Sequence, residues 1–166
     1  MPEEALARQL RNLLRRGYEG LTVAEAERRT QAGTLSRRTV VVTFDDAYAS
    51  TLRAKPLLDA VGYPGTVFVV TSFADSGAPL RWAGIEQWVD GPHAEELRPL
   101  DWTELQALHD AGWEIGSHTV THPRLPDADD ATLADELDRS RASIVQPIGR
   151  CDTIAYPYGL ADTQVA

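Results

Sequence analysis

Acidic and imidazole side chains follow apolar segments at two places in the sequence. Asp45 and Asp46 come directly after a β-branched run, and His118 and His122 follow a shorter apolar segment. Two adjacent carboxylates raise each other's pKa unless a cation or a shared proton compensates their repulsion. Two neutral imidazoles on one turn, together with a carboxylate, form a ligand set suited to Zn²⁺, Fe²⁺, Co²⁺ or Ni²⁺. We therefore predict a divalent metal site with positions left open for water and substrate.

Either signal alone has an ordinary explanation. An Asp-Asp pair is commonly a strand end or a helix N-cap, and a His-x-x-x-His pair is commonly two unrelated surface histidines. The metal prediction depends on both pairs following strands of one predicted sheet. His93 and His109 lack this placement, and we expect both to be solvated.

Short apolar runs alternate with helical patterns along most of the chain. The runs predict buried strands at residues 39–44, 65–70, 113–116 and 153–156. Helices are predicted between them at residues 50–61, 101–111 and 129–145. This alternation is typical of an α/β fold with a parallel sheet, in which reactive groups gather at the carboxyl ends of the strands. The Asp pair, the His pair and residues 156–159 all follow predicted strands.

The first 38 residues differ from the rest of the chain in charge. Residues 1–38 hold 8 Arg and 5 Glu, whereas residues 39–166 hold 8 basic and 20 acidic residues. Leu6 and Leu10 begin an apolar stripe at helical spacing, and a second helix is predicted after Thr22. We expect an N-terminal helical segment that packs on the main domain, with its basic residues on a solvated face.

Two of the predicted helices begin with capping boxes. In each case an oxygen-bearing side chain precedes a glutamate by three residues, so that each side chain can bind the other's backbone N–H. The pairs are Thr22 with Glu25 and Asp101 with Glu104.

Residues 72–99 match no regular element and contain Trp82 and Trp88. A loop of this length inside a compact domain is usually functional or disordered. The two tryptophans either offer flat apolar surfaces on which a sugar can stack or fill a gap in the core. The sequence leaves both interpretations open.

Three segments resemble the first three motifs of the NodB-homology polysaccharide deacetylases, carbohydrate esterase family 4. They are TFDD at residues 43–46, SHTVTHP at 117–123 and AYPYG at 155–159, and the similarity runs from about residue 18 to the C-terminus. The resemblance implies a distorted (β/α) barrel, of which residues 39–166 are expected to form roughly the first two thirds. We therefore expect a fold that is incomplete at its C-terminus.

The resemblance also implies roles for individual residues. Asp46, His118 and His122 correspond to the metal ligands, and Zn²⁺ is the metal expected first, with Co²⁺, Ni²⁺ or Fe²⁺ as alternatives. Asp45 corresponds to the catalytic base that takes a proton from water activated by the metal. The backbone N–H of Tyr158 corresponds to the oxyanion donor.

The expected reaction is hydrolysis of N-acetyl groups on an oligosaccharide or polysaccharide. Pro157, Trp82 and Trp88 are the candidate substrate contacts. Two further functions remain open, namely a hydrolase of small cyclic amides or imides on the same fold and a carbohydrate-binding domain that keeps the metal without catalysis. An iron oxygenase is disfavoured, because the Asp45 base would have no role in it.

Two departures from the family pattern affect the expected activity. Ala155 stands where many members have an arginine that holds the catalytic base in place. The strength of Asp45 as a base must therefore be adjusted by other groups, or be adjusted less. The Leu-x-His motif, whose histidine protonates the leaving amine in the family, is absent from the 166 residues. We therefore expect turnover that is slow or absent.

Composition excludes several other classes. A net charge of −9 disfavours nucleic acid and anionic membranes as partners. No apolar run is long enough to insert into a membrane, and the first residues lack the pattern of a signal peptide, so we expect a cytoplasmic protein or one whose leader has been removed. Cys151 is the single cysteine, which excludes an internal disulfide. The sequence does not indicate an oligomeric state.

Overall fold

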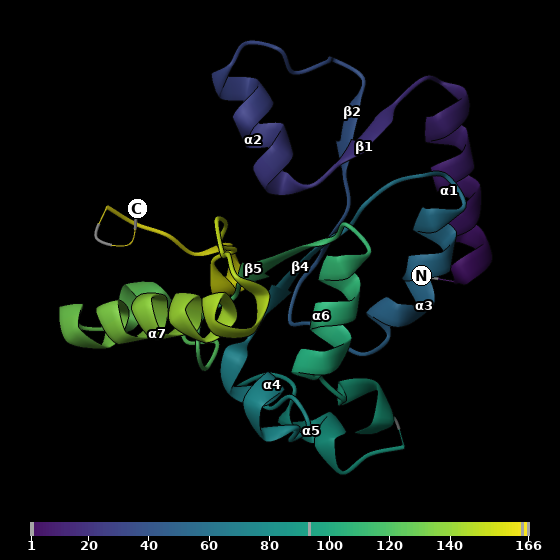
Figure 1. Ribbon diagram of the computed structural model, residues 1–166. Coiled ribbons are helices and arrows are strands. Elements are labelled where there is room, and N and C mark those ends of the chain that lie inside the picture. The colour runs from purple at the N-terminus through teal and green to yellow at the C-terminus, as the bar shows by residue number, and fades with distance from the viewer. Residues whose placement is uncertain (1, 93, 164, 166) are drawn as a thin grey trace.

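The computed structural model describes residues 2–92, 94–163 and 165. Figure 1 shows the order of the elements. The strands are β1 (Glu19–Leu21), β2 (Thr39–Val41), β3 (Thr43–Phe44), β4 (Thr66–Val69) and β5 (Glu114–Ser117). The α-helices are α1 (Glu3–Arg15), α2 (Val23–Gln31), α3 (Thr51–Asp59), α4 (Thr71–Ser76), α5 (Glu86–Val89), α6 (Trp102–Asp110) and α7 (Asp130–Ile148), and short 3₁₀ turns cover Ala94–Leu97, Leu125–Asp127 and Pro157–Gly159.

All described strand pairs are parallel, which confirms the predicted α/β class. β1 pairs with β2 in a two-stranded sheet, and β3, β4 and β5 form a three-stranded sheet in that order. In the second sheet Phe44 lies opposite Val67 and Val69 lies opposite Ser117, so the carboxyl ends of its strands lie side by side. Ile154 continues this sheet by one isolated parallel bridge to Ser117. Of the described helices, none is both long and apolar enough to cross a bilayer.

Two strand predictions differ from the structure. The run 39–44 was expected to be one strand buried on both faces, but it divides at Val42 into β2 and β3, which belong to different sheets and are only partly buried. Among the described residues each half has one partner strand, so its other edge stays open. The run 153–156 forms a bridge at Ile154 and no full strand.

β1 has no counterpart among the predicted strands. Its three residues include Gly20 and show no apolar alternation, so no local pattern distinguishes it from a turn. A Cβ on Gly20 would lie 2.4 Å from the Tyr63 ring, and the glycine is therefore needed for close packing there. The Tyr63 hydroxyl also donates to the Tyr18 carbonyl at 2.7 Å, which anchors the start of this strand.

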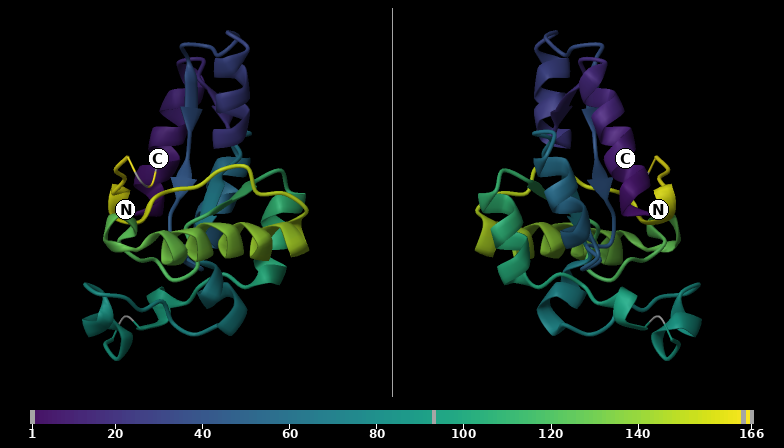
Figure 2. Two further views of the ribbon diagram at one scale, coloured as in Figure 1. Left: turned by 90° about the vertical axis from the view of Figure 1, so that its left-hand side faces the viewer. Right: turned by 90° about the vertical axis from the view of Figure 1, so that its right-hand side faces the viewer.

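The core lies between the three-stranded sheet and its helices. β4 is buried along its whole length, and Trp113 stacks on Phe44 with ring centroids 5.4 Å apart. α1 packs against α3, and α6 covers the sheet through Leu105 and Leu108. Figure 2 shows α2 and β1–β2 at one end of the molecule and the residues around α5 at the other.

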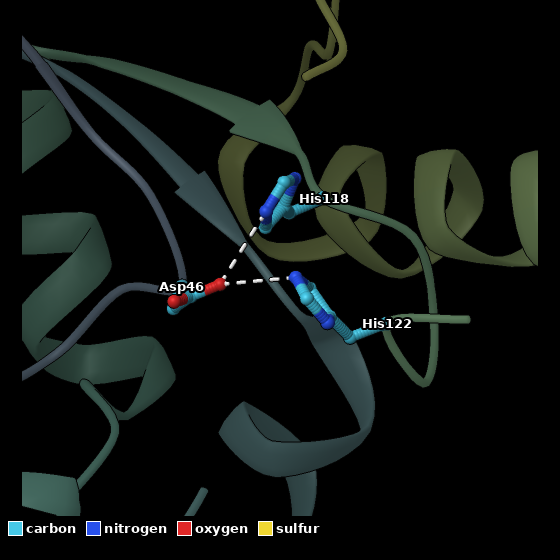
Figure 3. Close-up of side chains that lie close together, drawn as sticks. All are labelled: Asp46, His118 and His122. Carbon is cyan, nitrogen blue, oxygen red and sulfur yellow. Dashed lines mark ion pairs between the residues drawn. The ribbon is translucent and has the colours of Figure 1, made fainter. Parts of the chain in front are cut away.

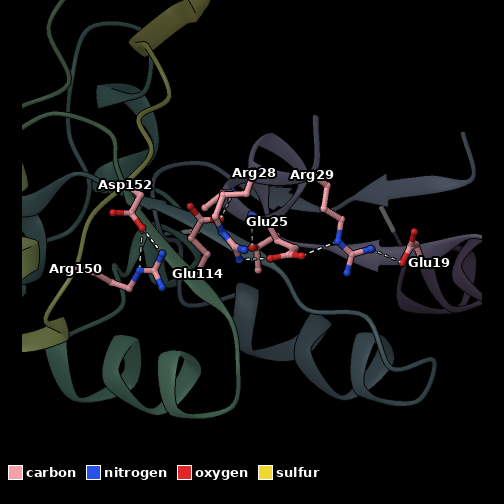
Figure 4. A network of polar contacts seen from close by, with 9 residues as sticks. Glu19, Glu25, Arg28, Arg29, Glu114, Arg150 and Asp152 are labelled. Atoms are coloured by element: carbon pink, nitrogen blue, oxygen red, sulfur yellow. Dashed lines mark hydrogen bonds and ion pairs between the residues drawn. The ribbon is translucent and has the colours of Figure 1, made fainter. Parts of the chain in front are cut away.

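The helix starts confirm one of the two capping boxes. Asp101 and Glu104 each bind the other's backbone N–H, at 2.8 and 3.1 Å. Thr22 accepts from the Glu25 N–H, but the Glu25 carboxylate contacts Arg28 and Arg29 instead of completing the box. Figure 4 shows Glu25 between these two arginines. The two guanidinium groups compete successfully for a carboxylate that the capping box requires.

The prediction of no regular structure at residues 72–99 is wrong in part. The segment holds the end of α4, all of α5 and a 3₁₀ turn. It is tied to the residues after β3, because Ala49 N–H donates to the Arg98 carbonyl and Leu100 N–H donates to the Ala47 carbonyl, both at 2.8 Å. These turns are too short to show helical periodicity, so the sequence carries no signal for them.

Candidate metal centre

Asp46, His118 and His122 come together at the carboxyl edge of the three-stranded sheet. Asp46 follows β3, and the two histidines follow β5, with β4 between these strands (Figure 3). Asp46 Oδ1 lies 3.3 Å from His118 Nε2 and 3.5 Å from His122 Nε2. One ligand atom from each residue lies within 4.8 Å of the other two. The tertiary structure thus brings together the three residues that the sequence predicts as ligands.

Backbone strain is concentrated around this cluster. The described residues other than glycine have positive φ at five positions, Asp46, Ala47, Thr119, His122 and Tyr158. A left-handed conformation costs an L-residue roughly 1–2 kcal/mol. Strain of this kind accumulates at functional sites, where the surrounding structure holds residues in uncommon conformations. Here it includes two of the three candidate ligands.

His118 is oriented by a backbone carbonyl. Its Nδ1 lies 2.7 Å from the Ala155 carbonyl, which requires Nδ1 to carry a proton, and its Nε2 faces Asp46. Burial alone would lower the pKa of His118, but the Asp46 carboxylate, the Ala155 carbonyl and the charge of Asp45 raise it above its usual value. A carbonyl partner on the second ring nitrogen is the usual arrangement for a histidine that binds metal.

His122 is held in its neutral form. Burial, together with the adjacent His118, lowers the pKa of His122 to about 4 despite the opposing effect of Asp46. Its ring packs between aromatic side chains, with Trp82 stacked at 4.1 Å and Tyr158 edge-on at 4.7 Å. A neutral imidazole is the form that binds a divalent metal.

The donor set fits a divalent cation. Asp46 Oδ1 is buried and has no hydrogen-bond partner among the described residues. An unpartnered buried carboxylate oxygen is costly, and a cation between Asp46 and the two Nε2 atoms would remove that cost. One carboxylate and two imidazoles leave further coordination positions open.

The other predicted catalytic residues lie near the cluster. Asp45 directly precedes Asp46 and is exposed, and its charge contributes to the raised pKa of His118. Tyr158 has positive φ in the 3₁₀ turn Pro157–Gly159; the residue is 46% exposed, and its ring lies beside His122. Pro157, the first residue of this turn, is buried.

The two tryptophans of residues 72–99 differ in position. Trp82 stacks on His122 and meets Phe73 edge-on at 5.9 Å, so it lies at the cluster. Trp88 lies on α5 with half of its surface exposed, and none of its described ring contacts reaches a candidate ligand. Of the histidines expected to be solvated, His109 is half-buried on α6, and His93 lies outside the described residues.

The sequence predictions did not include the groups that support the candidate ligands. They are the Ala155 carbonyl and two polar side chains on α7, Glu136 and Ser140, both of which are buried. A signal for the α7 residues did exist. Glu136 and Ser140 fall on the same helical face as Leu133 and Ile144, and a polar residue on an apolar face needs a buried partner.

Comparisons with known proteins identify related sequences and folds. Residues 32–166 match the sequence profile of a family described as polysaccharide deacetylase. Comparison with curated proteins gives no match. The fold is similar to a Streptococcus pyogenes deacetylase, PplD, in complex with acetate, with a TM-score of 0.83 and 22% identity over 98% of this chain and 66% of that one.

Two further solved structures share the fold. A de-N-acetylase from Aggregatibacter actinomycetemcomitans has a TM-score of 0.72 and 24% identity over 93% of this chain and 68% of that one. A family 4 carbohydrate esterase from Streptomyces lividans, in complex with acetate, has a TM-score of 0.57 and 22% identity over 76% of this chain and 54% of that one. The chain thus spans about half to two thirds of the length of these solved structures.

Proposed function

We propose a function for this chain from the premise that it belongs to the polysaccharide deacetylase family. The proposal is metal-dependent hydrolysis of N-acetyl groups on a carbohydrate, with Asp46, His118 and His122 as ligands and Zn²⁺ as the metal expected first. The observation that carries it is the convergence of Asp46 Oδ1, which is buried and has no hydrogen-bond partner among the described residues, with two imidazole Nε2 atoms. Solved structures of similar fold, one a de-N-acetylase and two in complex with acetate, agree with this substrate class.

Separate residues of the chain would take the different roles that hydrolysis requires. A divalent metal in this site would polarise the acetyl carbonyl and make water more acidic. Asp45, exposed beside the ligand Asp46, would accept the proton of the attacking water. The Tyr158 backbone N–H would donate to the oxygen that gains negative charge. The products are a free amine on the sugar and acetate.

Aromatic side chains at the cluster support a sugar substrate. Trp82 and Tyr158 contact different parts of the His122 ring, and Tyr158 is half-exposed. Flat apolar rings beside polar groups suit the apolar face of a pyranose, while the polar groups act on its acetamide. Trp88, which is also half-exposed, remains a second candidate for this role.

The proposal is tested with the zinc-loaded chain and oligomers of N-acetylglucosamine. We expect slow release of acetate, and we expect Asp45→Asn to abolish that release while bound zinc stays at the wild-type level. Hydrolysis of a cyclic imide without acetate release would favour the alternative hydrolase. Binding of zinc and sugar without either reaction would favour a non-catalytic carbohydrate-binding domain. A folded wild-type chain that binds no divalent metal would contradict the proposal.

A further inference from the structure

Glu136 is a buried carboxylate on α7 that faces the turn between the two histidines. Only 6% of its surface is exposed. Its Oε2 accepts from the backbone N–H groups of Val120 and Thr121 at 2.7 and 2.9 Å, and its Oε1 accepts from the Thr121 hydroxyl at 2.6 Å. One side chain thus binds three donors in the middle of the segment that carries both candidate ligands.

The same turn is held by a second side chain of α7. Ser140, one helical turn after Glu136, lies 2.7 Å from the Ser117 hydroxyl, and Ser117 Oγ in turn accepts from the Thr119 N–H at 3.1 Å. The Thr119 hydroxyl accepts from the His122 N–H at 3.1 Å. α7 therefore supports the turn at its start through Ser140 and at its centre through Glu136.

Without these contacts from α7, we expect the turn to change its conformation. Thr119 and His122 both have positive φ, which is uncommon for residues other than glycine and especially unfavourable for the β-branched Thr119. Without Glu136 the Val120 and Thr121 N–H groups would lose their acceptor, and Val120 is itself buried. A buried donor without a partner is costly, so the turn would rearrange to expose these groups and would carry His122 with it.

We propose that Glu136 is a positioning residue for the metal centre. Its carboxylate fixes the turn between His118 and His122, and through that turn it sets the affinity of the cluster for a divalent cation. This inference rests on the proposed function, because it takes Asp46 and the two histidines as metal ligands. Groups that orient metal ligands from behind commonly change metal affinity 10- to 100-fold when they are removed.

Geometry rather than charge is the property that matters at this position. A glutamine can accept both backbone N–H groups through its carbonyl and donate to the Thr121 hydroxyl, which also accepts hydrogen bonds. An aspartate keeps the charge but is one methylene too short to reach all three donors. We therefore expect zinc affinity to follow the reach of the side chain. The glutamine variant should bind zinc most nearly as wild type does, the aspartate variant more weakly and the alanine variant most weakly.

The test measures the zinc dissociation constant of the full chain by competition with a chromophoric chelator. We expect Glu136→Ala to raise the constant by roughly 10- to 100-fold, Glu136→Asp to raise it less, and Glu136→Gln to stay near wild type. Asp138→Ala is the matched control, because Asp138 is an exposed acid on the same helix. Circular dichroism identifies the variants that remain folded, and Glu136→Asp serves if Glu136→Ala does not fold.

Amide hydrogen exchange of the metal-free chain gives a second measurement. Faster exchange at Val120 and Thr121 in Glu136→Asp or Glu136→Ala, but not in Asp138→Ala, is the expected result. A folded Glu136→Ala or Glu136→Asp that binds zinc as tightly as wild type would overturn the inference and leave the proposed function intact. A wild-type chain that binds no zinc would instead overturn the proposed function, and exchange at the turn would still decide whether Glu136 holds it.

Discussion

At the scale of single residues, the two candidate histidine ligands differ in what surrounds them. His118 has a backbone carbonyl on Nδ1 and two nearby carboxylates, whereas the Nδ1 of His122 is buried without a hydrogen-bond partner among the described residues. His122 is instead held by the rings of Trp82 and Tyr158. The orientation of His118 is therefore set by a polar contact and that of His122 by packing and its backbone turn.

The ligand assignment predicts which variants lose the metal. Asp46→Ala and His122→Ala each remove one of three ligands, so we expect bound zinc to fall from about one equivalent to a small fraction. Elemental analysis of the dialysed proteins measures it. His109→Ala is the control, since His109 lies on α6 away from the cluster. Wild-type metal content in both ligand variants would refute the assignment.

Substrate contact by Trp82 is a separate prediction. Removal of one aromatic contact typically weakens binding by about tenfold, so Trp82→Ala should raise the KM for N-acetylglucosamine oligomers by roughly that factor. Because Trp82 also packs on His122, bound zinc is measured in the same samples. Trp88→Ala serves as the comparison and should raise KM less. An unchanged KM in a zinc-replete Trp82→Ala protein would contradict sugar stacking at this residue.

At the scale of elements, α6 begins with a capping box that is reinforced by an ion pair. The Glu104 carboxylate accepts from the Asp101 N–H and makes two hydrogen bonds to Arg98 at 2.9 Å. The Arg98 guanidinium is the main cause that lowers the pKa of Glu104. The charged form of Glu104 is therefore favoured in the folded state.

Glu104→Ala tests this helix start. We expect the variant to lose about 1 kcal/mol of unfolding free energy at pH 7, the scale of one lost cap. Since the folded pKa lies below the unfolded value of about 4.3, the contribution is complete above that pH and fades as the pH falls through the folded pKa. Urea unfolding at pH 7 and pH 3.5 should show a smaller gap between variant and wild type at the lower pH.

A matched control is available in a second arginine pair. Glu96 pairs with Arg53 at 3.0 Å, but both side chains are more than half exposed. Exposed pairs of this kind contribute little to stability, so Glu96→Ala should change the unfolding free energy by less than about 0.5 kcal/mol. A gap for Glu104→Ala that stays constant between the two pH values would contradict the role assigned to its charge.

At the scale of the whole molecule, the metal cluster joins segments that are far apart in the sequence. Asp46 follows β3 and the histidines follow β5, while α7 supports the histidine turn from outside the sheet. A cation bound to all three ligands would therefore connect both outer strands of the three-stranded sheet. Because unfolding separates the candidate ligands, a bound metal would stabilise the folded chain by mass action.

Zinc should accordingly raise the melting temperature. At a free zinc concentration about 100 times the dissociation constant, binding adds about 2.7 kcal/mol, which corresponds to roughly 5–11 °C for a chain of this size. Differential scanning calorimetry with zinc and with EDTA measures the difference. Asp46→Ala should show no such shift. An equal shift in this variant would mean that zinc stabilises the chain from another site.

Short sequence patterns were enough to predict the candidate metal-binding residues and the main helices and strands of this protein. The candidate ligand residues, β4, β5 and the helices α1, α2, α3, α6 and α7 were predictable, because apolar runs, helical periodicity and capping residues are all encoded within a few neighbouring positions. The convergence of Asp46, His118 and His122 was predictable for a related reason. Parallel strands have their carboxyl ends at the same edge of the sheet, so residues that follow different strands come close together there. The positions of the strands in the sequence were therefore enough to predict this proximity.

The tertiary structure alone decided the division of residues 39–44 between two sheets, the pairing of β1 with β2, and the place of Trp82 on His122. It also decided that Glu136 and Ser140 face the histidine turn and that Glu25 pairs with arginines instead of closing its capping box. Each of these outcomes depends on partners distant in the sequence or on competition between two good partners. A local pattern can indicate that a residue needs a buried partner, but it does not identify that partner, because the free energy of such a contact is set by the group that arrives from elsewhere in the fold.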